Sequence, residues 1–311
     1  MRRGDFASAW EICDEALENA TLRDPARPRH LQSVWDGSPL GGRRVLVRCH
    51  HGLGDTIQFV RYAAPLKRIA AEVILWTQPA LLPLLRSARG VDRLLPLHDG
   101  APECAYDADI ETMELPHIFR STVDTFPGDV PYLDAPAAVL DAGGSRPPAA
   151  LNVGLAWRAG GWDARREVPF ASMSRLAGIP GVAFWALQKE PRGDEAGGLV
   201  RWSSLVRTVR GTARLMRALD LVITIDSMPA HLAGALAAPV WTLLPRDCDW
   251  RWMDARDESP WYPTMRLFRQ RRSGDWDGVV DRVACELESL VAERRLPGVA
   301  ASAPGRHISL G

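Results

Sequence analysis

Two blocks of alternating short apolar runs and amphipathic stretches limit what this 311-residue chain can fold into. The first block opens with "RRVLVRC" (43–49) and the second with "LNVGLAW" (151–157). Apolar runs of this length are typical of buried strands, and the stretches between them have the spacing of amphipathic helices. Strands that alternate with helices form parallel sheets, so the sequence predicts an α/β fold with two sheets.

The spacing of these runs gives an expected series of elements in each block. The expected strands are 43–49, 71–78, 91–97, 151–157, 182–188, 221–225 and 239–245. The expected helices are 55–70, 79–88, 170–179, 211–220, 228–237 and 276–295. The helix over 55–70 is expected to bend at Pro65, because proline lacks the N–H that a helix interior needs.

Shifts in composition divide the chain into five segments. The Pro-, Gly- and Ala-rich stretch that ends at residue 150 has no apolar period and is typical of a linker. The expected segments are a helical segment over 1–38, a first α/β domain over 39–135, a linker over 136–150, a second α/β domain over 151–295 and a disordered tail over 296–311. Two such domains predict a cleft between them, because open parallel sheets bind ligands at the carboxyl ends of their strands.

The first segment contains one predicted amphipathic helix, "GDFASAWEICDEALENA". Phe6, Trp10, Cys13 and Leu17 share one face of this helix. The helix is similar to the second half of a tetratricopeptide unit, and a single unit cannot bury its apolar face by stacking on neighbouring units. It is therefore expected to pack on the main body of the protein or to bind a protein partner.

Charge and cysteine content argue against several classes of partner. The chain carries 38 basic and 38 acidic residues, so it lacks the surplus of Lys and Arg that binds nucleic acid or an anionic membrane. Arginines outnumber lysines, and arginine is suited to bidentate contact with phosphate. The five cysteines are scattered and form no Cys-x-x-Cys pair, which argues against disulfides and structural zinc. The sequence contains no apolar run of transmembrane length and no signal peptide, so a cytoplasmic protein is expected.

The turn "HHGLGD" joins the first expected strand to the first long helix. Gly52 and Gly54 permit positive φ and close backbone approach, and a helix start offers free N–H groups. Asp55 fits two roles, because aspartate is a common N-cap residue and its carboxylate could equally face a substrate. His50 and His51 have no clear third ligand, so no metal site is expected.

The second block repeats this arrangement at "LVITIDSMPAHLAGALA". Asp226 ends an apolar strand, and the next helix opens at Ser227 and Met228. Pro229 has no N–H, so few backbone donors remain in the first turn. A carboxylate beside a helix N-terminus suits a diphosphate and the hydroxyls of an attached sugar. Capping is the alternative role for Asp226, and a buried structural role is the alternative for His231.

Further polar side chains follow two other strands of the second block. The loop "WRAGGWDARREVP" carries Arg158, Arg165 and Arg166, which could clamp a leaving phosphate or form a solvated surface. Gln188 and Lys189 end the next expected strand in an equivalent position.

The stretch "PRDCDWRWMDARDESPWYP" is dense in tryptophan and arginine. Trp250, Trp252 and Trp261 are suited either to lining a pocket for a base or sugar or to packing an interdomain loop.

Several motifs together resemble glycosyltransferase family 9, and in particular its bacterial branch fused to tetratricopeptide repeats. They are "GLGDTIQFVRYAAPL", "VGLAW", "LDLVITIDSMPAHLAGALAAPVWTLLP", "DWRWM" and "SPWYPTMRLFRQ". The family includes the ADP-heptose heptosyltransferases. The resemblance runs from Trp35 to the closing helix and implies the GT-B architecture. This architecture has two facing Rossmann-like domains with parallel sheets, here preceded by a short helical remnant of the repeats.

The resemblance also implies roles for individual residues. Asp55 matches the aspartate of the family's Gly-x-Gly-Asp turn and becomes the candidate catalytic base. Asp226, Ser227 and His231 match a D-T-x-x-x-H element, with serine in place of threonine. Arg166 falls near a cationic position that is often lysine in heptosyltransferases. The residues expected on the sugar-donor side are Arg166, Gln188, Lys189, Asp226, Ser227, Met228 and His231, and those expected on the acceptor-side loop are His51, Gly52, Gly54 and Gln58.

The expected activity is metal-independent, inverting transfer of a sugar, such as a heptose, from a nucleoside-diphosphate sugar to a hydroxyl acceptor. The resemblance favours an ADP-sugar and implies no further cofactor, while the acceptor, whether a glycan, a protein or a small molecule, stays open. A non-catalytic sugar-nucleotide-binding or scaffold protein is one alternative, and a sugar-nucleotide epimerase of the same architecture is another.

Overall fold

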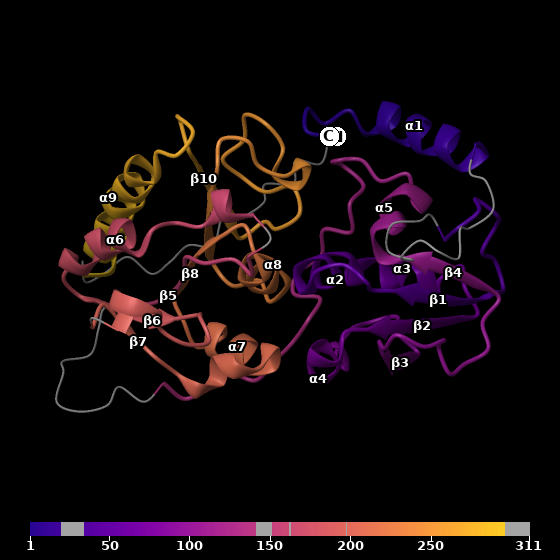
Figure 1. The fold of residues 1–311 in the computed structure, drawn as a ribbon, viewed down its shortest axis with the longest axis horizontal. Coiled ribbons are helices and arrows are strands. Elements are labelled where there is room, and N and C mark those ends of the chain that lie inside the picture. Colours follow the sequence, from indigo (N-terminus) through magenta and orange to yellow (C-terminus); the bar gives the residue numbers. More distant parts are fainter. Residues whose placement is uncertain (20–33, 141–150, 162, 197, 296–311) are drawn as a thin grey trace, which may run out of the picture.

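Two parallel sheets lie side by side in the protein (Figure 1). A computed structural model describes residues 1–19, 34–140, 151–161, 163–196 and 198–295. The predicted tail over 296–311 and residues 141–150 of the predicted linker lie outside the described residues. The two sheets come from the two blocks of the sequence, on either side of that linker.

The first sheet contains four strands in the order β3-β2-β1-β4, and all its pairs are parallel. Its strands are β1 (Arg44–Arg48), β2 (Glu72–Thr77), β3 (Arg93–Pro96) and β4 (Ala108–Glu111). In the central strand, Leu46 lies between Ile74 of β2 and Asp109 of β4. The chain order reverses between β1 and β4, so their carboxyl ends form the switch point at which open α/β sheets bind ligands.

The second sheet contains six parallel strands in the order β10-β9-β8-β5-β6-β7. Its strands are β5 (Leu151–Ala156), β6 (Val182–Ala186), β7 (Val200–Arg201), β8 (Leu221–Ile225), β9 (Val240–Leu244) and β10 (Met265–Arg269). Numbered within this half, the order is the 3-2-1-4-5-6 arrangement of dinucleotide-binding folds. Its switch point lies between β5 and β8.

Helices connect the strands and cover both faces of the second sheet. The α-helices are α1 (Phe6–Glu18), α2 (Leu53–Phe59), α3 (Ala63–Lys67), α4 (Leu82–Leu85), α5 (Leu115–Ile118), α6 (Phe170–Met173), α7 (Val209–Met216), α8 (Met228–Ala235) and α9 (Trp276–Arg295). The 3-10 helices are η2 (Val60–Tyr62), η3 (Pro79–Leu81), η4 (Thr112–Glu114), η5 (Ala164–Arg166), η6 (Ser174–Gly178), η7 (Gly193–Ala196), η8 (Ser204–Arg207) and η9 (Trp250–Trp252). One hydrophobic core contains α6 and α9, and a second contains α7 and α8 together with the core of the first half.

Three strands of the structure were not predicted, and each departs from a simple apolar run. β4 carries Asp109, whose carboxylate is neutralised by the fully buried Arg48 at 2.5 Å. β7 has only two residues, and β10 is an edge strand that carries Arg266 and Arg269. A charged residue interrupts the apolar pattern by which a strand is predicted from sequence. Its ion-pair partner and the position of the strand at the edge of a sheet both depend on the tertiary structure.

The predicted long helix over 55–70 is broken earlier than expected. α2 ends at Phe59, the 3-10 turn η2 follows, and α3 then begins at Ala63. The break lies one turn before Pro65. In a regular α-helix, a proline ring clashes with the carbonyl oxygen of the residue four positions before it. α2 also begins at Leu53, two residues before the predicted start. The helix predicted over 55–70 is therefore interrupted at η2, one turn before the bend expected at Pro65.

The N-terminal helix α1 packs on the main body of the protein (Figure 1). Phe6 and Trp10 are buried, and the Trp10 indole donates a hydrogen bond of 2.8 Å to the carbonyl oxygen of Ser121. The Phe6 ring contacts Phe126 in the first half and Trp250 in the second, with ring centroids 5.1 Å and 6.1 Å apart. The predicted apolar face is thus used within the chain, while the relation to a tetratricopeptide repeat and the protein partner remain predictions.

Candidate functional site

A cleft of about 790 Å³ opens where the carboxyl ends of the two sheets meet. It is lined by His50, His51, Gly52, Leu53, Gly54, Asp55, Met113, Ala159, Gly160, Asp163, Arg165, Arg166, Asp226, Ser227, Met228, His231, Pro245, Asp247, Cys248, Asp249 and Arg251. These residues follow the strands β1, β4, β5, β8 and β9, so both switch points contribute. The volume is in the range of pockets that hold small ligands.

Asp55 lies in the first turn of α2 and has both carboxylate oxygens engaged. Its Oδ2 accepts a hydrogen bond of 2.9 Å from the backbone N–H of Gly52, the residue that precedes the helix. Its Oδ1 accepts a hydrogen bond of 2.6 Å from Nη2 of Arg251, which belongs to the second half. Asp55 is therefore the third residue of the helix instead of its N-cap, yet its side chain still caps the helix. The geometry allows both roles that the sequence left open.

Asp226 and Arg166 lie together on the second half. Asp226 follows β8 directly, and burial raises the pKa of its carboxyl, an effect that Arg166 opposes. Arg166 Nη1 donates to the Asp226 carbonyl oxygen at 3.2 Å and lies 3.7 Å from its Oδ2. The guanidinium Nε is buried with no partner among the described residues. One cation is thus held beside the start of α8.

The start of α8 offers backbone donors, as predicted from the position of the proline. Pro229 occupies the first turn, and the N–H of Ala230 bonds to the Ser227 carbonyl oxygen at 3.0 Å. The remaining donors of that turn are the N–H groups of Ser227 and Met228. Both residues line the cleft, at the positive end of the helix dipole.

His231 is held in a buried aromatic environment. Its Nδ1 lies 3.0 Å from the hydroxyl of Tyr262, and its ring stacks on Trp252 with centroids 5.3 Å apart. Burial lowers the pKa of His231 well below its ordinary value, so the ring is neutral. His231 also borders the cleft, so its packing contacts agree with a structural role and its contact with a ligand stays a prediction.

Gly54 is needed for close approach rather than for an unusual backbone angle, since neither it nor Gly52 has a positive φ. A Cβ on Gly54 would lie 2.8 Å from Cδ2 of His231. α2 and α8 pack together at the junction of the two halves, as Figure 1 shows. Removing the glycine would therefore push the two halves apart beside Asp55.

We expect Gly54→Ala to lower the free energy of unfolding by about 1–3 kcal/mol, the usual cost of overpacking. The His231 ring cannot move aside easily, because Trp252 and Tyr262 hold it. Chemical denaturation measures the effect, with Gly178→Ala as control because no atom lies within 4 Å of a Cβ there. Equal stability of the two variants would show that α2 shifts without cost.

Three predicted site residues lie outside the cleft lining. Gln58 is fully buried in α2, and its amide has no hydrogen-bond partner among the described residues. It points into the interior because it lies one turn after Gly54, on the side of α2 that is covered. Gln188 and Lys189 follow β6, the strand beyond the switch point, and Gln188 donates at 3.4 Å to the carbonyl oxygen of Arg158.

The tryptophans of the 250–261 segment are packing residues in this structure. Trp252 and Trp261 are fully buried, and Trp261 stacks on Phe126 with centroids 3.7 Å apart. Trp250, Trp252 and Trp261 are absent from the residues that line the cleft. Of the two roles open from the sequence, the structure supports the packed interdomain loop.

Two residues that contact Asp55 or His51 were not singled out from the sequence. Arg251 lies between two tryptophans in "DWRWM", and no local pattern indicates that it would pair with Asp55. Glu111 ends β4, the strand that was missed, and its Oε1 lies 3.7 Å from Nε2 of His51. The sequence offers little signal for Glu111, because the four residues of β4, "ADIE", include a second acidic residue and form no apolar run.

Glu111 is 4% exposed, and burial raises its pKa to about 8 from an ordinary value of 4.5. The folded state then keeps a proton on Glu111 where the unfolded chain has released it, so Glu111 destabilises the fold increasingly as pH rises between these two values. Glu111→Gln removes this titration. Relative to wild type, we expect its free energy of unfolding to gain about 3 kcal/mol between pH values of about 5 and about 8.

Denaturant unfolding at several pH values measures this gain. The exposed Glu103 provides the control, because Glu103→Gln should leave the pH dependence of wild type unchanged. Parallel curves for Glu111→Gln and wild type would show that Glu111 is ionised in the folded protein.

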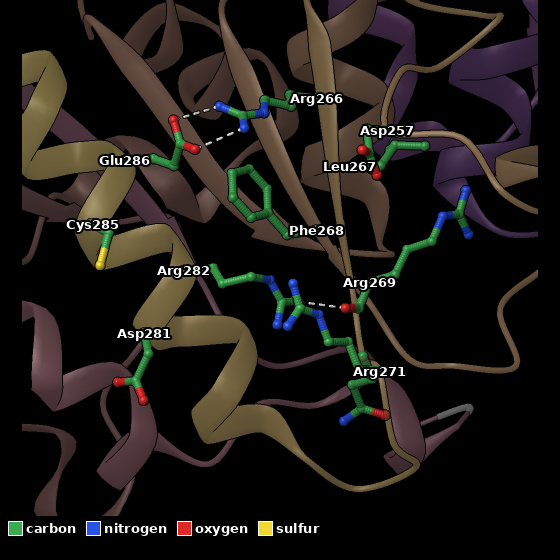
Figure 2. A pocket seen from close by; sticks show the side chains of 11 residues that line it. Asp257, Arg266, Leu267, Phe268, Arg269, Arg271, Asp281, Arg282, Cys285 and Glu286 are labelled. Atoms are coloured by element: carbon green, nitrogen blue, oxygen red, sulfur yellow. Dashed lines mark hydrogen bonds and ion pairs between the residues drawn. The ribbon is translucent and has the colours of Figure 1, made fainter.

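A second cavity, of about 490 Å³, lies between β10 and α9 (Figure 2). Arg266 forms a bidentate pair with Glu286 at 2.8 Å and 2.9 Å, and Arg282 donates to the carbonyl oxygen of Arg269. The cavity is lined by residues of β10 and α9 and by the loop residues Asp257, Gln270 and Arg271. It is away from both switch points, so the cleft is the better candidate for a functional site.

The described residues contain no group of three or more His, Cys, Asp or Glu side chains arranged to hold a metal ion. Among the helices of the described ranges, none combines the length and apolar character of a membrane span. All five cysteines are free thiols.

The two parallel sheets have the fold of solved family 9 glycosyltransferases, which confirms the predicted GT-B arrangement of two α/β halves. The glycosyltransferase family 9 protein of Veillonella parvula is similar with a TM-score of 0.55 and 12% identity, over 82% of this chain and 99% of that one. ADP-heptose LPS heptosyltransferase II of E. coli gives a TM-score of 0.55 and 14% identity, over 81% and 100%. The iron-containing dodecameric heptosyltransferase TibC of E. coli, in complex with ADP-D-beta-D-heptose, gives 0.54 and 13%, over 83% and 81%.

Among curated sequences, the chain is similar to Protein FlbA of Caulobacter vibrioides, at 26% identity over 93% of this chain and 53% of FlbA. The chain thus spans about half the length of that relative. No protein-family model matches the sequence.

Proposed function

We propose that the protein is an inverting glycosyltransferase that moves a sugar from a nucleoside diphosphate to a hydroxyl acceptor. One observation carries this proposal: a single cleft brings Asp55 of the first half together with Asp226, Arg166 and the start of α8 in the second. A candidate base and a diphosphate-binding surface thereby face the same space.

On the sugar-donor side, the N–H groups of Ser227 and Met228 would hold the diphosphate at the helix start. Arg166 would add a cation beside it, and the two together would stabilise the charge that develops as the diphosphate leaves. We therefore propose that transfer needs no metal ion. Asp226, which is buried next to these groups, would contact the sugar.

On the acceptor side, His51, Gly52 and Gly54 border the space next to Asp55. The acceptor oxygen would attack the anomeric carbon while Asp55 takes the hydroxyl proton. The bond from that carbon to the diphosphate breaks, and the nucleoside diphosphate leaves with the electron pair. Attack from the face opposite the leaving group gives inversion.

An ADP-sugar is the first donor class to test, because solved proteins of similar fold include an ADP-heptose heptosyltransferase and a heptosyltransferase in complex with ADP-heptose. A cytoplasmic location is part of the proposal, in keeping with the free thiols.

The test offers ADP-heptose and other ADP-, GDP- and UDP-sugars to the purified protein and measures binding by calorimetry and nucleotide release by chromatography. One nucleotide class should bind equally well in magnesium and in EDTA, and nuclear magnetic resonance of the product should show inverted anomeric configuration. A strict need for magnesium would contradict the metal-free site. Binding without any release would indicate a non-catalytic sugar-nucleotide-binding protein, and release of an epimerised sugar would indicate an epimerase.

A further inference from the structure

Arg251 makes an ion pair with Asp55 across the junction of the two halves. The pair joins residues 196 positions apart, at 2.6 Å, and the side chains are 9% and 25% exposed. Arg251 belongs to η9 in the second half, whereas Asp55 belongs to α2 in the first. A charge-assisted hydrogen bond this short and this well shielded from solvent restricts the orientation of the carboxylate.

Several contacts hold Arg251 rigidly. The carboxylate of Asp249 accepts hydrogen bonds from the backbone N–H of Arg251 at 3.0 Å and from Nη1 of Arg251 at 2.9 Å. The Trp261 indole donates to the carbonyl oxygen of Arg251 at 3.0 Å. The guanidinium lies 5.4 Å from the ring centroid of Phe59 and 5.3 Å from that of Trp250. With its own side chain fixed, Arg251 can hold a partner in one place.

The support of this loop extends to the N-terminal segment. Phe6 contacts Trp250, the side chain of Arg2 pairs with Asp254 at 2.8 Å, and the N–H of Asp254 donates to the carbonyl oxygen of Arg2 at 2.9 Å. These contacts hold the first residue of η9, Trp250, and Asp254, which follows η9. Arg251 therefore keeps its position without the ion pair to Asp55.

Resting on the function proposed above, we propose that Arg251 is a positioning residue for the base. It holds one oxygen of Asp55 while the Gly52 N–H holds the other, which aims the remaining lone pairs of the carboxylate into the cleft. It acts through Asp55 and not through the sugar nucleotide. Because the pair crosses the junction, it also keeps the base of one half in register with the diphosphate surface of the other.

A double-mutant cycle in turnover tests this role. Arg251→Gln removes the charge and should lower kcat about 10–100-fold, the usual effect of misplacing a reactive group, with the dissociation constant of the sugar nucleotide changed less than about twofold. In an Asp55→Asn background the same substitution should cause no further loss of kcat, since residues that act as a unit are not additive. Arg251→Lys, which keeps the charge, should restore part of the rate.

Arg266→Gln is the control, because Arg266 also pairs with a carboxylate, that of Glu286 at 2.8 Å, and this pair lies outside the cleft. Thermal unfolding is measured for every variant to check that it is folded. If Arg251→Gln does not fold, the double-mutant cycle is carried out with Arg251→Lys. Equal loss of kcat in both backgrounds, with weaker sugar-nucleotide binding, would place Arg251 on the sugar nucleotide and overturn the proposal. An unchanged turnover rate of Arg251→Gln would overturn the positioning role of Arg251 and leave the proposed function standing. A wild-type protein that is inactive with every sugar nucleotide would overturn the proposed function itself.

Discussion

Asp55→Asn should lower turnover about 10²–10⁴-fold, the usual contribution of general-base catalysis, while the affinity for the sugar nucleotide stays nearly constant. Asparagine keeps the size of the side chain and caps a helix about as well as aspartate, so the hydrogen bond from the Gly52 N–H can be retained. What the substitution removes is the proton acceptor and the charge that pairs with Arg251. Steady-state transfer, together with calorimetry of sugar-nucleotide binding, separates the two effects.

Asp275→Asn is the matched control for this experiment. The carboxylate of Asp275 accepts the backbone N–H of Gly278 at 2.9 Å at the start of α9, away from the cleft. It should bind and turn over like wild type. A folded Asp55→Asn variant with a near-normal rate would return Asp55 to a capping role and leave the proposed mechanism without its base.

Arg166→Ala should reduce kcat/KM by about 10²–10³-fold, as expected when a preorganised donor to a developing charge is lost. Unlike the change at Asp55, this one should also weaken binding of the nucleoside diphosphate, because the cation beside α8 is lost in the ground state as well. Arg166→Lys should recover part of the loss, since it keeps the charge without the two-pronged contact. Calorimetry with the free nucleoside diphosphate and steady-state transfer measure both quantities.

The control for this change is Arg175→Ala, which removes an exposed arginine paired with Asp281 on the far side of the second half. It should leave binding and turnover unchanged. Arg166→Ala also leaves the buried carboxyl of Asp226 without its cation, so thermal unfolding is measured in parallel. Full nucleotide affinity in a folded Arg166→Ala variant would mean that Arg166 supports Asp226 and does not bind the diphosphate.

Much of the site could be predicted from sequence because parallel strands all present their carboxyl ends at one edge of a sheet. The residues that follow β1 and β8 therefore had to lie near each sheet's switch point, and Asp55, Asp226, Ser227 and Met228 all line the cleft. The same reasoning predicted that Gln188 and Lys189 also line the cleft, whereas β6, which precedes them, lies one strand away from the switch point. Strand order within a sheet is set by long-range pairing, which local sequence does not show.

Local sequence also determined where the helices α8 and α9 begin and that the chain forms two α/β halves. Continuous apolar runs such as β8 are typical of strands that are buried on both faces of a parallel sheet. Pro229 restricts the backbone donors of its helix turn whatever surrounds the helix. The apolar run and the missing N–H of proline are local properties, so the sequence alone is enough to predict them.

Tertiary structure alone decided the rest. The burial of Gln58, the closeness of Gly54 to His231 and the pairing of Arg251 with Asp55 all depend on how α2 packs against the second half. β4 was hidden for a related reason, since Asp109 is compatible with a buried strand only where Arg48 neutralises it. The energies of such contacts depend on distances between residues far apart in the chain, and those distances exist only once the two halves have packed together.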